Sequence, residues 1–122
     1  MKHKIKKDQV EDILAIVLSI ASKDGIISEK ELSTLKKEFS RFFSHKLTHE
    51  QNNKALEDFF SSNEQIEDYL EKIDDEELRK PILRLALIAA ASDGFDIREN
   101  FGYQKALMFW NFSHEENILE SE

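Results

Sequence analysis

Two short acidic turns carry the residues of this 122-residue chain that are best suited to chemistry. Asp24 stands before a glycine and is followed by Glu31, and Asp93 stands before a glycine and is followed by Glu99. Carboxylate oxygens are the ligands that hard divalent cations such as Ca²⁺ and Mg²⁺ prefer. If the two turns meet in space, we expect these four residues to form a cation site.

A purely structural interpretation competes with the cation site. An Asp before a glycine commonly makes an Asx-type turn, and a Glu near a helix start commonly completes a cap. A true EF-hand loop is excluded, because its first ligand position would fall on Ile20 in one copy and Ala89 in the other. Neither side chain has an oxygen to offer a Ca²⁺ ion. The four histidines match no HExxH pattern, and we expect them to be solvated.

The last apolar segment, from Phe101 to Phe112, offers a second kind of site because it is unusually aromatic. Aromatic residues that occupy several faces of one short helix cannot all be buried in a small domain. Those left exposed would form a protein-binding patch. We expect Tyr103, Phe109 and Trp110 to contact such a partner, while the competing interpretation places the aromatic residues in the core.

Composition limits the classes of function. The net charge of −8 argues against a nucleic-acid-binding protein, because such affinity depends on clustered Lys and Arg. The chain has no Cys, which excludes disulfides and thiolate chemistry and favours a reducing, cytoplasmic location. The uncharged run Ile13–Ser22 is too short to span a membrane, so we expect no transmembrane segment. The acidic body also opposes membrane-surface contact by the basic stretch Lys2–Lys7.

Hydrophobic periodicity predicts an all-α fold, a compact bundle of five to six helices in a single domain spanning residues 1–122. We expect an ordered core over residues 8–113, with tails at 1–7 and 114–122. Capping patterns predict helices that begin at Asp8, Ser28, Thr48, Asn63 and Asp96. A further helix follows the acidic run Asp74–Glu77, where Pro81 either kinks it or begins a new helix, and we favour the kink.

The segments 13–31 and 81–99 share one plan, which suggests an internal repeat. Each consists of an apolar helix, an Asp-Gly turn and a capped second helix. The second turn is one residue shorter, so Glu99 comes one position early relative to Glu31. The two apolar helices should lie at the centre of the domain.

These repeated motifs resemble the TerB-like family, the tellurite-resistance-associated domain that is also similar to the N-terminal region of DjlA-type co-chaperones. The resemblance is carried by ASKDGIISEKE at residues 21–31 and AAASDG at residues 89–94. It implies an all-helical fold with the two Asp-Gly turns near each other. It also implies a loose association with stress response and partner binding, and no known reaction.

Taken together, these observations favour a non-enzymatic, stress-associated interaction module that binds or senses a divalent cation through the two acidic turns. The alternative is a metal-free protein-interaction adaptor that uses the aromatic C-terminal helix. An enzyme ranks third, because the sequence offers no recognisable nucleophile–base pair.

Overall fold

The computed structural model describes residues 3–22, 27–92 and 100–112, and it confirms an all-α bundle. These residues form six helices: α1 (Lys7–Ala21), α2 (Glu29–Phe42), α3 (His49–Ser61), α4 (Ile66–Leu70), α5 (Glu76–Ala91) and α6 (Phe101–Phe109). Within the described ranges the single β-type contact is a parallel bridge between His3 and Phe43.

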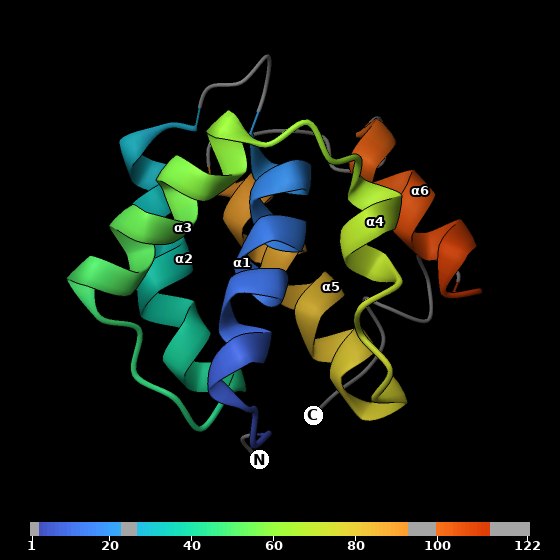
Figure 1. Ribbon diagram of the computed structural model, residues 1–122, viewed down its shortest axis with the longest axis horizontal. Coiled ribbons are helices and arrows are strands. Elements are labelled where there is room, and N and C mark those ends of the chain that lie inside the picture. The colour runs from blue at the N-terminus through green and yellow to red at the C-terminus, as the bar shows by residue number, and fades with distance from the viewer. Residues whose placement is uncertain (1–2, 23–26, 93–99, 113–122) are drawn as a thin grey trace.

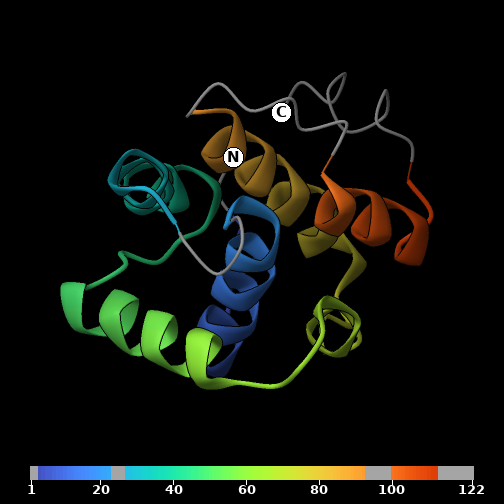
Figure 2. The same cartoon turned by 90° about the horizontal axis from the view of Figure 1, so that it is seen from above.

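Helix α1 is the hub of the bundle. It packs on α5, α4, α3 and α6, while α5 also packs on α2 (Figure 1). Figure 2 shows α2 and α3 on one side of α1, with α4 and α6 on the other. Helix α6 packs mainly on α4 and also on α1 and α5, whereas α2 packs on α5.

The composition of α1 explains its central position. From Ile13 to Leu18 every side chain is buried, so no face of this part of the helix is polar. Helix α5 supplies the matching surface with Ile82, Leu83, Leu85 and Ala86, all fully buried. A helix that is apolar all round is stable in water only when neighbours cover every face, as they do here.

The predicted caps of α2 and α3 are confirmed. The N–H of Glu31 donates to Ser28 Oγ at 3.1 Å, and the N–H of Ser28 donates to Glu31 Oε1 at 3.0 Å. Thr48 and Gln51 exchange the same pair of bonds at the start of α3. Each box supplies two of the partners that the first turn of a helix otherwise lacks.

Two other predicted caps are wrong. Helix α1 begins before Asp8, at Lys7, and the N–H of Lys6 donates to Gln9 Oε1 at 2.7 Å. Helix α4 begins after Gln65 rather than after Asn63, and the N–H of Gln65 donates to Asp68 Oδ2 at 2.8 Å. In both helices the side chain at the third helical position accepts a hydrogen bond from the backbone N–H of the residue before the helix. This third residue therefore determines where the helix begins.

Helix α5 runs without a break from Glu76 to Ala91, with Pro81 inside it and buried. Asp75 caps it by accepting a hydrogen bond from the N–H of Glu77 at 3.0 Å. The cap expected over Asp96–Glu99 lies outside the described residues, and α6 is capped by Asn100. In the described parts of the chain, the helices fall short of the length and apolarity that a membrane span requires.

Candidate functional site

Glu31 is the one predicted cation ligand that the structure describes. Its Oε1 atom is used in the Ser28 capping box, and the residue is only 4% exposed. Its second carboxylate oxygen, Oε2, is buried and has no hydrogen-bond partner. A buried carboxylate oxygen without a partner costs free energy, so this atom is the unusual feature of the first predicted unit.

Asp24, Asp93 and Glu99, the other three predicted ligands, lie outside the described residues. Whether the two Asp-Gly turns meet therefore stays a prediction. Among residues 3–22, 27–92 and 100–112, no three His, Asp or Glu side chains are grouped so that they could hold a metal ion.

Helix α6 presents the second candidate surface, and its inner face belongs to the core. Tyr103 is 1% exposed and Trp110 is 6% exposed. The guanidinium group of Arg79 donates hydrogen bonds to the carbonyl of Ile73. Its central carbon lies 5.7 Å from the centre of the Trp110 ring. Two of the three residues predicted to contact a partner thus pack inside the domain, and Phe109, at 43% exposed, is the one that reaches solvent.

The start of α6 is held tightly against the end of α1. Asn100 accepts a hydrogen bond from the N–H of Tyr103 through Oδ1 and donates through Nδ2 to the carbonyl of Ile20. A Cβ atom placed on Gly102 would lie 3.0 Å from the carbonyl oxygen of Ser19. Glycine therefore permits the close approach of the two helices at this point.

The outer face of α6 carries large apolar side chains that are exposed, beside the exposed Gln104 and Lys105. Phe101 is 79% exposed and Met108 is 82% exposed, seven positions apart on the helix, with Phe109 adjacent. Residues separated by seven positions share one helix face, so Phe101 and Met108 lie on the same face, and Phe109 lies at its edge. We call Phe101, Met108 and Phe109 the α6 stripe. The number of aromatic residues predicts that some of them are exposed, but it does not indicate which ones.

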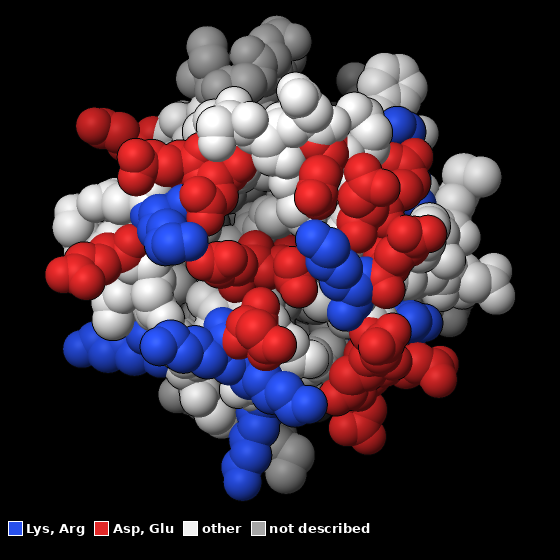
Figure 3. Space-filling model, viewed as in Figure 1, with Lys and Arg blue, Asp and Glu red and all other residues white. Residues whose placement is uncertain are grey.

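A cluster of charged side chains that sequence reasoning missed lies where α1, α3 and α4 converge. Figure 3 shows acidic side chains gathered over this face with lysines among them. Lys54 contacts Glu11 at 3.0 Å and Asp58 at 2.9 Å, and Lys72 contacts Glu64 at 3.5 Å and Asp12 at 4.0 Å. The hollow between them has a volume of about 200 Å³. The pairs Lys54–Glu11 and Lys72–Asp12 join distant parts of the chain, so no local spacing signals them, whereas Lys54–Asp58 and Lys72–Glu64 are local pairs.

The cluster shifts the titration of two of its members. Partial burial raises the pKa of Asp12, and the neighbouring Asp8, Glu11 and Glu64 add to that effect, while Lys72 opposes it. The hydrogen bonds that Lys54 donates to Asp58 and Glu11 raise the pKa of Lys54 above its usual range. The two lysines of the cluster balance two of its four carboxylates, and we assign the cluster a structural role.

Comparison of the chain with protein-family models, curated proteins and solved structures finds no match. The resemblance to TerB-like domains therefore rests on the motifs at residues 21–31 and 89–94 alone.

Proposed function

We propose that this protein is a non-enzymatic interaction module that binds a partner protein through the α6 stripe. The observation that supports this proposal is the exposure of Phe101 and Met108, which leaves two large apolar side chains in water on one helix face. Covering such a pair on binding would remove apolar area from water and favour association. The cytoplasmic, stress-associated role implied by the TerB-like motifs is part of the same proposal.

The way α6 is attached supports its use as a docking element. Its inner face is fixed by Tyr103 and Trp110, and its first turn is tied to α1 by Asn100. A helix held in this way keeps its exposed side chains in one geometry. A partner then gains contacts without having to order the helix first.

Photocrosslinking tests the proposal. A benzoylphenylalanine introduced at Met108 should give a discrete adduct with a second protein in cells, and the adduct should be lost when Phe101 is also changed to Ser. The same probe at Glu57, an exposed position on α3, serves as the matched control. Identical adducts from both positions, or none from position 108, would refute binding through α6.

A divalent cation at the first acidic turn is the second candidate, and the buried Oε2 atom of Glu31 favours it. The unused oxygen belongs to the helix start that follows Asp24 in the sequence, and a cation would supply the missing partner. This candidate needs Asp24, and in its full form Asp93 and Glu99, to approach that oxygen.

Thermal unfolding of EDTA-treated protein with and without millimolar Ca²⁺, Mg²⁺ or Mn²⁺ tests the cation proposal. A ligand at 100 times its Kd should add about 2.7 kcal/mol of stability. The stabilisation should disappear in Glu31→Gln, which retains an oxygen for the Ser28 cap, and in Asp24→Asn. Glu29→Gln in the same helical turn is the control and should respond like the unchanged protein. The absence of any ion-specific shift would leave Glu31 as a cap alone.

A further inference from the structure

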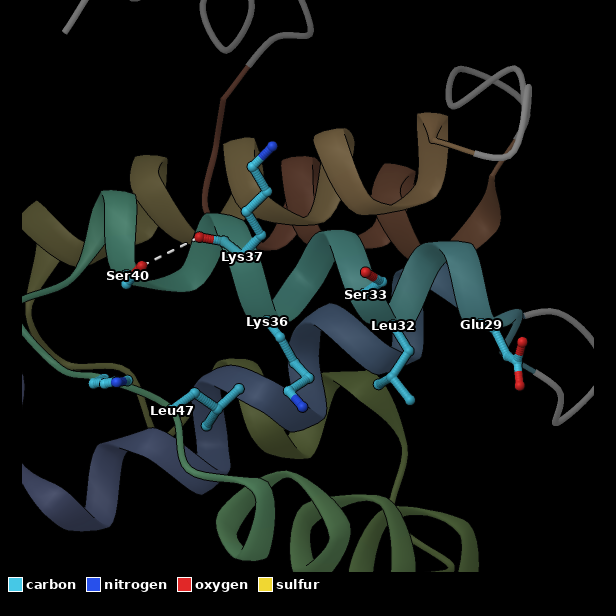
Figure 4. A pocket seen from close by; sticks show the side chains of 8 residues that line it. Glu29, Leu32, Ser33, Lys36, Lys37, Ser40 and Leu47 are labelled. Atoms are coloured by element: carbon cyan, nitrogen blue, oxygen red, sulfur yellow. Dashed lines mark hydrogen bonds between the residues drawn. The ribbon is translucent and has the colours of Figure 1, made fainter.

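A pocket of about 490 Å³ lies along the exposed side of α2 and continues into the loop that follows it. It is lined by Glu29, Leu32, Ser33, Lys36, Lys37, Ser40, Lys46 and Leu47. Figure 4 shows Leu32, Lys36 and Leu47 on the same side of α2, with Lys37 directed to the other side. The pocket therefore combines Lys36 and the partly buried Leu32 with Leu47, a core residue that is 7% exposed.

Helix α2, which lines this pocket, and the next helix α3 pack on different helices. Helix α2 packs on α5, whereas α3 packs on α1, and Figure 2 shows the two helices well separated. The lining residues from Glu29 to Ser40 follow α2 for about three turns. This shape is an elongated groove parallel to a helix, which suits an extended or helical segment of chain.

The charge of this groove is opposite to that of the molecule. The whole chain carries 25 acidic and 17 basic residues, yet three of the eight lining residues are Lys and one is Glu. Lys54, Lys72 and Lys105 elsewhere are paired with carboxylates. Lys36, Lys37 and Lys46, in contrast, form no ion pair within the described part of the chain. Because Lys37 is directed to the other side of α2, Lys36 and Lys46 are the charges available to an acidic ligand in the groove.

We propose that the α2 groove binds an acidic, amphipathic peptide segment of a partner protein. Apolar side chains of the segment would cover Leu32 and Leu47, and its carboxylates would pair with Lys36 and Lys46. Recessed leucines favour such a segment over a flat lipid surface, which requires apolar side chains that protrude. The net charge of −8 disfavours a nucleic acid, a long polyanion that would also meet the acidic faces. Helices α2 and α6 lie on opposite sides of α1 (Figure 1), so this proposal is independent of the proposed function.

Fluorescence anisotropy with the full chain tests this inference. The probe is a labelled peptide of about 15 residues that carries Leu on one helical face and Glu beside it. Its affinity should fall as salt increases. Lys36→Glu and Lys46→Glu should each weaken binding about tenfold, because each replaces an attraction by a repulsion. Leu32→Ser should weaken binding without changing the salt dependence.

Lys30→Glu is the matched control, because Lys30 is exposed on α2 but does not line the groove. It should change the affinity by less than about twofold. A second peptide with every Glu replaced by Gln should bind poorly. Equal binding of the two peptides, equal effects of Lys30→Glu and Lys36→Glu, or preferential binding to vesicles of anionic lipid would each overturn the proposal.

Discussion

The side-chain amide of Asn100 donates a hydrogen bond of 2.6 Å to the backbone carbonyl of Ile20, 80 residues earlier in the chain. Ile20 lies in the last turn of α1, where carbonyl groups have no partner within the helix. The same Asn100 side chain caps α6 through its oxygen. One residue thus satisfies the end of one helix and the beginning of another.

Asn100→Ala should destabilise the fold by about 1–3 kcal/mol, because it removes an N-cap and leaves a partly buried carbonyl without its donor. Urea unfolding followed by circular dichroism measures the change. Asn53→Ala, at an exposed position in α3, is the control and should have an effect within about 0.5 kcal/mol. A loss no larger than that of the control would show that the bond to Ile20 contributes nothing to stability.

Gly102→Ala should lower stability, although alanine normally favours a helix interior by about 1 kcal/mol over glycine. The added methyl group would meet the carbonyl oxygen of Ser19 at 3.0 Å, and this backbone atom cannot rotate away. Thermal unfolding decides between the two effects by the sign of the change in Tm. A higher Tm would mean that α6 shifts away from α1 at little cost.

The two faces of α6 should respond differently to substitution. Trp110→Ala removes a buried aromatic side chain and should cost about 3–5 kcal/mol. Met108→Ser changes a side chain that is 82% exposed and should stay within about 0.5 kcal/mol. Denaturant unfolding of both variants measures the contrast, and similar losses would contradict the assignment of the inner and outer faces.

Asp12→Asn should stabilise the protein at neutral pH. Because the pKa of Asp12 is raised in the folded state, the folded protein holds this proton to a higher pH than the unfolded chain does. The free energy of unfolding therefore falls as the pH rises from the usual pKa of an Asp carboxyl to the raised one. The neutral amide avoids this loss, so its advantage should shrink as the pH is lowered below the usual range of an Asp carboxyl. Urea titrations at pH 7 and at acidic pH measure the difference, with the exposed Glu57→Gln as control. A benefit that grows on acidification would show that the ion pair with Lys72 dominates instead.

Local chemistry explains which features could be predicted from the sequence. The caps at Ser28 and Thr48 involve bonds across three residues, and both are as expected. The predicted start of α1 is wrong because the side-chain oxygen of Gln9, and not a carboxylate, accepts the hydrogen bond from the backbone at the start of the helix. In the same way, a helix with apolar residues on every face cannot indicate which of them a neighbour will cover. Contact with α1 and α4 buries Tyr103 and leaves Met108 outside.

The charged cluster on α1, α3 and α4 was unpredictable for a related reason. Lys54 and Glu11 are 43 residues apart and meet because α3 packs on α1. Such a pair depends on how the helices pack, and no periodicity in the sequence indicates it.

The packing between helices that are distant in the sequence also affects how the protein is made. Helix α2 finds its packing surface on α5, which ends at Ala91, and α1 is covered partly by α6. A growing chain that has left the ribosome only as far as α3 therefore has no complete core. Its apolar α1 should remain dependent on chaperones until nearly the whole domain has been synthesised.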